Sequence, residues 1–252
     1  MNDTEPASRA VTAALLVIGD EILSGRTKDK NIGFCADYLT EIGIDLCEVR
    51  IVPDVISEIV GALNAMRARY TYVFTTGGIG PTHDDMTADA VAAAFGVEIG
   101  EDPRIINLLL QWMKPEDLNA ARRRMARVPK GAALVENTVS KIPGFWIGNV
   151  IVMAGVPAIM QAMLTAVGPK LDTGKRTVSV TILAGDVAEG AYAAELSAVA
   201  DAYPALGIGS YPSMANGRFN NEIVVRGKDA EAVAQAAAKI EAFLARLQAE
   251  KV

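Results

Sequence analysis

The first 96 residues alternate between short apolar runs and longer stretches with helical spacing, and this alternation constrains the fold more than any other feature. Apolar runs at 13–18 and 70–75, and an alternating run at 44–52, each precede a stretch in which apolar residues recur every three or four positions. Strands that alternate with helices form a parallel sheet flanked by helices. We therefore predict an α/β fold whose strands all end along one edge of the sheet.

The rest of the chain divides at a polar stretch, 172–175, which we predict to be a linker. Before it, residues 101–127 are expected to be mostly helical, and Gly148-Asn149 is a two-residue hairpin signal. The predicted hairpin strands and the helix after them are 144–147, 150–153 and 158–167. Beyond the linker, the order of predicted elements is β-α-β-β-α, with two strands joined through Asn216-Gly217, which indicates a small α+β domain.

Composition argues against several classes of partner and of structural site. The net charge of −6 argues against a nucleic acid or an anionic membrane as partner, because both need a broad basic surface. Cys35 and Cys47 are the only cysteines and have no CxxC spacing, so a zinc site or disulfide framework is not expected. Residues 1–12 lack the order of a signal peptide and are predicted to be flexible. No apolar run reaches the length of a membrane span, and we expect a cytoplasmic protein.

The segment 75–87 reads TTGGIGPTHDDMT and connects a predicted strand to a predicted helix. Gly77, Gly78 and Gly80 allow the backbone to approach an anion closely, and the helix start adds unpaired N–H groups. The segment lacks the Gly-Lys-Ser/Thr of a Walker loop and the last glycine of a dinucleotide fingerprint. It is therefore predicted to bind phosphate groups in another way.

Acidic residues follow two of the predicted strands. Asp84 and Asp85 could hold a divalent cation that bridges a diphosphate, and Asp20 and Glu21 could supply a second cluster across the cleft. The alternatives are helix capping for the first pair and solvated loop charges for the second. His83, the only histidine, could donate to a phosphate or make a structural hydrogen bond.

Basic residues gather in one place, at Arg122, Arg123 and Arg124. Such a run is most often a solvated or ion-paired helix face, and the alternative is a contact with a terminal phosphate.

These motifs together resemble the molybdopterin-binding-domain family. The resemblance rests on GDEIL-x-G at 19–25, on the segment 75–87, on Asn31 and on Gly155-Val156-Pro157, and it covers roughly 13–171. It is strongest for the nucleotide-utilising domain of CinA, the competence/damage-inducible protein, and for the related domain of eukaryotic FAD synthase. Residues 172–252 are similar in order to the middle domain of CinA.

The resemblance implies a three-layer α/β sandwich with a mostly parallel sheet, followed by the small α+β domain. It also implies a pocket at the strand edge that takes a phosphorylated or adenylylated ligand, and a homo-oligomer. Asp85 matches an aspartate of the family's glycine motif, and Asp54 resembles its second acidic position. One departure is that Ile159 stands where CinA proteins commonly carry a glutamate.

The predicted site combines these arguments. Asp84 and Asp85 are the candidate catalytic residues, and with Glu21 they are the candidate ligands of a divalent metal ion, whether Mg, Mn or Co. The candidate phosphate- or substrate-binding residues are Gly19, Asp20, Glu21, Asn31, Asp54, Thr76, Gly77, Gly78, Gly80, Thr82, His83, Gly155, Val156 and Pro157.

Three functions are compatible with such a site. The first is metal-dependent hydrolysis of a nucleoside-diphosphate conjugate such as ADP-ribose or FAD, which the resemblance implies. The second is adenylylation of molybdopterin, and the third is a non-catalytic module that binds a nucleotide or a pterin. In each case the partner is a small molecule.

Overall fold

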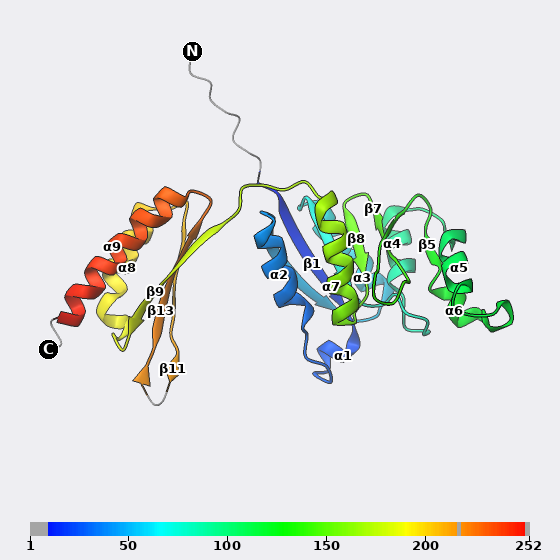
Figure 1. Ribbon diagram of the computed structural model, residues 1–252, viewed down its shortest axis with the longest axis horizontal. Helices are drawn as coiled ribbons and strands as arrows, with labels where there is room; N and C mark the ends of the chain where they lie inside the picture. The colour runs from blue at the N-terminus through cyan, green and yellow to red at the C-terminus, as the bar shows by residue number, and fades with distance from the viewer. Residues whose placement is uncertain (1–9, 216–217, 250–252) are drawn as a thin grey trace, which may run out of the picture. The chain divides into compact units, whose positions relative to one another are not determined.

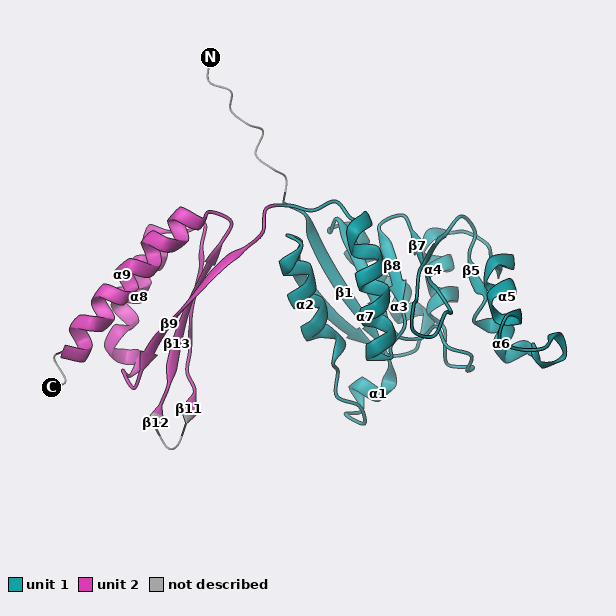
Figure 2. Cartoon of the chain, in the orientation of Figure 1, with its two compact units in different colours: residues 1–174 teal, residues 175–252 magenta. Residues whose placement is uncertain are grey.

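The computed structural model describes residues 10–215 and 218–249 of the 252-residue chain (Figure 1). Contacts divide the chain into two compact units, Met1–Gly174 and Lys175–Val252 (Figure 2). Most of the predicted flexible N-terminus, residues 1–9, lies outside the described residues, as does the predicted Asn216-Gly217 turn. Thr12, which we assigned to that N-terminal segment, is instead the first residue of strand β1, because it pairs with Asp45 of the neighbouring strand.

The first unit is built on a sheet with the strand order β2-β1-β3-β8-β7-β6. The pairs β1–β2, β1–β3 and β3–β8 are parallel, whereas β7 pairs with its neighbours in antiparallel fashion. The mostly parallel α/β sheet is thus confirmed. Its strands are β1 (Thr12–Ile18), β2 (Asp45–Val52), β3 (Tyr72–Thr76), β6 (Ala133–Val135), β7 (Gly144–Ile147) and β8 (Val150–Met153).

Helices cover both faces of this sheet and make three layers (Figure 1). On one face Cys35, Leu39 and Met160 are among the helix residues that pack on Leu15 and Val17 of β1. On the other face a second cluster joins residues of α3 and α4 to Ala14, Leu16 and Ile18 of β1. The helices are α1 (Asp20–Leu23), α2 (Asn31–Glu41), α3 (Ile56–Arg67), α4 (Thr87–Phe95), α7 (Pro157–Val167) and the short 3-10 helix η2 (Gly168–Lys170).

Residues 99–129 form a separate segment, here called the arm. It contains β4 (Ile99–Glu101), α5 (Pro103–Leu110), the 3-10 helix η1 (Pro115–Asp117), α6 (Ala120–Arg124) and β5 (Arg127–Pro129). The expectation of a mostly helical 101–127 is only partly met, because β4 and β5 pair as a small antiparallel sheet. Ile105 and Leu109 of α5 are buried in the same core as α3 and α4, so the arm is packed on the unit.

The second unit is a small α+β domain, as predicted. Its antiparallel sheet has the order β10-β13-β9, and its two long helices share a core with one face of that sheet. The elements are β9 (Val178–Gly185), α8 (Glu189–Ala202), β10 (Gly207–Tyr211), β11 (Met214–Ala215), β12 (Arg218–Phe219), β13 (Asn221–Gly227) and α9 (Ala230–Ala249). No helix in the described part of the chain is long and apolar enough to cross a membrane.

Candidate functional site

A pocket of about 580 Å³ lies where β1, β3 and β8 end. Parallel strands in an open α/β sheet bring their carboxyl ends to one edge, where ligands bind. The pocket is lined mainly by residues of the three loops that follow these strands, with further residues from other loops and apolar side chains around them. The lining residues are Ile18, Gly19, Glu21, Thr27, Asp54, Gly77, Gly78, Ile79, Gly80, Thr82, Asp84, Asp85, Met125, Ser140, Ile142, Ala154, Gly155, Val156, Pro157, Ile159 and Met163.

The middle loop, 77–86, here called the glycine turn, is packed tightly against the end of β1. Gly77 has a φ of 101°, and a Cβ atom there would lie 2.1 Å from the carbonyl oxygen of Ile18. Thr87, at the start of α4, closes the turn: its hydroxyl donates to the Gly77 carbonyl at 2.9 Å and its N–H to the Gly78 carbonyl at 3.0 Å. We predicted from residue type alone that these glycines shape an anion-binding turn. The structure gives the steric reason for glycine at position 77.

The backbone amides of the turn have different partners. The Gly77 N–H donates to the carbonyl of Met153, and the Gly80 N–H donates to Asp85 Oδ1 at 2.6 Å. The N–H groups of Gly78 and Ile79 donate to no acceptor within the described residues. Of the four amides from Gly77 to Gly80, those of Gly78 and Ile79 are therefore available to an anion.

Asp85 orders the glycine turn. Its carboxylate accepts hydrogen bonds from the Gly80 N–H, from the Thr82 N–H at 2.8 Å and from the Thr82 hydroxyl at 2.5 Å. A carboxylate has about four acceptor positions, so three bonds leave little capacity for a metal ion. Asp85 also does not cap α4, for which no side-chain cap is formed. Its place in the pocket agrees with the prediction, but its bonds are those of a residue that holds the turn.

Asp84 is the more accessible carboxylate of the pair, with 63% of its side chain exposed. Hydrogen bonding with the Thr82 hydroxyl is the main cause that holds the pKa of Asp84 below its ordinary value. The positive charge of Arg124 acts in the same direction more weakly. Asp84 is therefore ionised at neutral pH. It lines the pocket, and the loop hydrogen bonds described above go to Asp85 instead.

Two further carboxylates come from the loops after β1 and β2. Asp54 accepts a hydrogen bond from the Asp20 N–H at 3.0 Å, and Glu21 lies with its carboxylate against Gly19. Burial raises the pKa of Asp54, and repulsion from Asp20, Glu21 and Asp84 raises it further. That repulsion shows that negative charge is concentrated on this side of the pocket.

The third loop follows β8. Gly155 packs directly on Gly77, since a Cβ on Gly155 would lie 3.2 Å from the Gly77 Cα. Asn31, at the start of α2, donates through Nδ2 to the Gly155 carbonyl at 2.9 Å. The N–H groups of Gly155 and Val156 donate to no acceptor among the described residues. This loop thus adds donors to the same pocket.

Four predicted ligand residues lie outside the pocket lining. Asn31 and Thr76 are buried, and the Asn31 Oδ1 and the Thr76 hydroxyl have no hydrogen-bond partner among residues 10–215 and 218–249. Asp20 is exposed, and its N–H donates to Asp54. The His83 side chain is 97% exposed, 4.0 Å from Asp84. These four residues could reach a ligand only indirectly or after moving.

The sequence reasoning missed one wall of the pocket, which comes from the loop 137–142. Ser140 and Ile142 line the pocket, and the buried Asn137 holds their loop with its amide group. Lys141 has a φ of 66°, which is rare for a residue other than glycine. Asn137 and Ser140 are residue types that favour turns. Because β6, the strand that precedes them, was not predicted, this turn could not be placed near the site.

The pocket fits a cation that is shared with a ligand better than a cation held by the protein alone. No lysine or arginine is among the described residues that line it, and its carboxylates repel one another. Yet across residues 10–215 and 218–249 no group of three His, Cys, Asp or Glu side chains is arranged to hold a metal ion. Mg²⁺ is usually bound by one or two carboxylates together with substrate phosphates. Oxygen ligands of this kind are compatible with that mode of binding.

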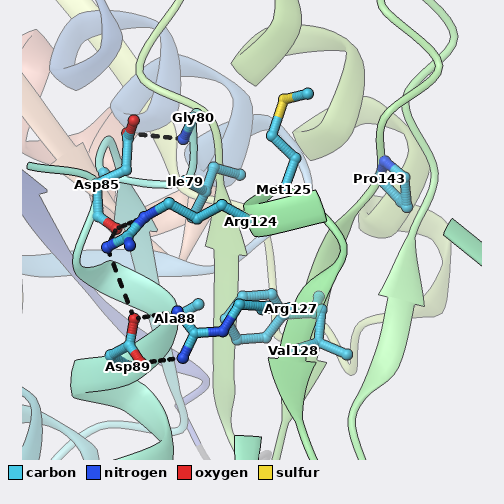
Figure 3. Close-up of a pocket in the computed structure, with 12 residues that line it drawn as sticks. Ile79, Gly80, Asp85, Ala88, Asp89, Arg124, Met125, Arg127, Val128 and Pro143 are labelled. Carbon is cyan, nitrogen blue, oxygen red and sulfur yellow. Dashed lines mark hydrogen bonds and ion pairs between the residues drawn. The ribbon is translucent and has the colours of Figure 1, made fainter. Parts of the chain in front are cut away.

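The basic run does not reach the pocket. Arg122 donates to the Asp117 carbonyl, and Arg123 pairs with Glu101 at 2.8 Å. Arg124 donates to the backbone carbonyl of Asp85 (Figure 3). The alternative of a phosphate contact is thus not what the structure shows for these residues.

Comparison with known proteins identifies the family. Residues 14–173 match the family described as "Probable molybdopterin binding domain", and residues 177–251 match "FAD synthase, middle domain". The chain belongs to the molybdopterin-binding-domain family, in its CinA-like branch related to FAD synthase, as the motifs predicted.

Three similar proteins illustrate this membership. A crystal structure titled as the protein CinA with unknown function, from Thermoplasma acidophilum, is 32% identical with a TM-score of 0.60, covering 64% of this chain and 98% of that one. A protein of Archaeoglobus fulgidus is 30% identical over 91% of this chain and 96% of its own length. A "Probable FAD synthase" of Caenorhabditis briggsae is 27% identical over 90% of this chain, which spans 48% of that relative.

Proposed function

We propose that this protein is a metal-dependent pyrophosphatase that hydrolyses a nucleoside-diphosphate conjugate such as ADP-ribose or FAD. One observation carries the proposal: unpaired backbone N–H groups and the carboxylates of Glu21, Asp54 and Asp84 border the same pocket. The match of residues 177–251 to the middle domain of FAD synthase supports a nucleotide-related ligand.

Each group of residues would have a separate role in binding and hydrolysis. The N–H groups of Gly78 and Ile79 would donate to the phosphate oxygens, since backbone donors at a glycine turn suit anions. Asp84 and Glu21 would hold the divalent cation, which when bound neutralises the diphosphate and activates water. Asp85 would keep the turn in shape. In the reaction water attacks one phosphorus, the bridging P–O bond breaks, and two phosphate monoesters leave.

The test is an assay of ADP-ribose and FAD hydrolysis with Mg²⁺, Mn²⁺ or Co²⁺. Asp84→Asn should lower kcat by about 100-fold, because a charge that acts on the transition state is lost. Glu58→Gln, a charge removal at an exposed position of α3 outside the pocket, should leave turnover unchanged. Full activity of Asp84→Asn, or turnover that persists in a chelator, would contradict the proposal.

A second candidate is a module that binds such a nucleotide or a pterin without turning it over. The observation in its favour is that the described residues contain no preformed metal-ligand cluster, and that Asp85 is already bonded within its loop. Tight binding of ADP-ribose or FAD with no products under any of the three cations would support this function instead.

A further inference from the structure

We propose that Arg124 is a positioning residue for the pocket, which sets the shape of the glycine turn without touching the ligand. The inference rests on the proposed function, in which that turn receives the diphosphate. Arg124 does not line the large pocket but a separate cavity of about 20 Å³. Because Gly78, Ile79, Gly80 and Asp85 line both spaces, the turn forms the wall between them.

The contact of Arg124 with the turn is a two-pronged hydrogen bond. Its Nη2 lies 2.8 Å and its Nε 3.2 Å from the backbone carbonyl oxygen of Asp85 (Figure 3). The side chain is 27% exposed, so the guanidinium is partly shielded from water. A guanidinium presents its donors in a fixed planar fork, and it therefore restrains the direction of the carbonyl as well as its distance.

An ion pair also holds the same part of the arm to α4. Arg127 makes two contacts with the Asp89 carboxylate, at 2.5 and 3.1 Å, and Arg124 Nη2 lies 3.9 Å from the same group (Figure 3). Asp89 belongs to the first turn of α4, immediately after the glycine turn. The two arginines therefore hold both the turn and the helix that follows it.

Asp85 transmits this restraint to the donors in the pocket. Its carbonyl is fixed by Arg124, while its carboxylate binds the N–H groups of Gly80 and Thr82. A shift of the Asp85 backbone would move the carboxylate and release those two amides. The unpaired N–H groups of Gly78 and Ile79 lie directly before them in the chain, so their direction depends on the same contact.

The first measurement is hydrogen exchange of individual amides by NMR in Arg124→Gln, Arg124→Lys and the control Arg123→Gln. Arg123 lies on the same helix but pairs with Glu101. In Arg124→Gln the Gly80 and Thr82 amides should exchange at least about tenfold faster, as expected when a hydrogen bond to a charged group is lost. Amides of β1 and α3 should be unaffected. Lysine should restore part of the protection, since it keeps the charge without the fork.

The second measurement is the Kd of the intact protein for ADP-ribose in the presence of Mg²⁺. Arg124→Gln should weaken binding by about tenfold, Arg124→Lys by less, and Arg123→Gln should bind as the wild type does. Unchanged exchange in Arg124→Gln, faster exchange throughout the first unit, or a loosened turn with wild-type affinity would each overturn the inference. Absence of ADP-ribose binding by the wild type counts against the proposed function, whereas the exchange comparison still decides the role of Arg124.

Discussion

Gly77 occupies the most constrained backbone position of the site. Its φ of 101° lies in the region that favours glycine, and the Ile18 carbonyl fills the space that a side chain would need. Gly77 thus fixes the start of the glycine turn against the end of β1. Gly61, inside α3, has nothing within 4 Å of the position where a Cβ would stand.

Gly77→Ala should destabilise the first unit by more than about 3 kcal/mol, since the methyl group meets a backbone atom that cannot rotate away. Gly61→Ala is the matched control and should stabilise by about 0.5–1 kcal/mol, because alanine is the better helix former. Thermal unfolding of the two variants measures both effects. Equal melting temperatures would show that the turn can move away from Ile18.

At the residue scale, the sequence predicted which residue types gather at the strand edge, but not where each side chain points. Glu21, Asp54 and Asp84 line the pocket as we expected. Asp85 looked like a metal ligand because a carboxylate beside glycines suits a cation. Its actual partners are amides three and five residues earlier in the chain, and only the folded turn brings them to it.

Among the loops, 137–142 is held by one side chain. Asn137 is 4% exposed; its Oδ1 accepts from the N–H groups of Val139 and Ser140, and its Nδ2 donates to the Ser140 hydroxyl and the Ile142 carbonyl. A buried amide that satisfies four partners replaces the regular hydrogen bonds that this loop lacks.

Asn137→Ala should cost about 2 kcal/mol, because it leaves backbone groups of the loop without partners. For a unit of this size that corresponds to a fall in Tm of about 4–8 °C. Asn137→Asp, which keeps the acceptor oxygen but loses the donors, should fall between alanine and the wild type. A Tm of the alanine variant within 1 °C of the wild type, on the order of the measurement error, would contradict this account.

At the scale of elements, long helical patterns and the hairpin strands β7 and β8 were predicted well, whereas the three-residue strands were missed. The helix predicted at 158–167 agrees with α7 to within a residue, because several buried apolar side chains define its inner face. Strands β4, β5 and β6 have three residues each, too few to show a period of two. Their strand conformation depends on pairing, of β4 with β5 and of β6 with β7.

The whole molecule consists of two units, each with its own hydrophobic core. The core clusters of residues 13–171 and of residues 182–244 share no side chain. Every residue that lines the candidate pocket belongs to the first unit. Independent cores are the physical condition for independent folding.

Calorimetry of the full chain should therefore show two unfolding transitions, and a fragment of residues 1–174 should reproduce one of them within a few degrees, on the order of 3 °C. The same fragment should keep the ADP-ribose affinity of the full chain, which serves as a second readout. A single transition of the full chain, or a fragment that unfolds without cooperativity, would show that the second unit supports the first.

The contact between Gly77 and Gly155 also limits how the binding site can adapt. The middle loop touches the Ile18 carbonyl on one side and the loop after β8 on the other, with glycine facing glycine. Neither side has a side chain that could be trimmed to widen the space. Any enlargement for a bulkier molecule must therefore come from lining residues outside this contact, such as Thr27, Ser140, Ile159 and Met163.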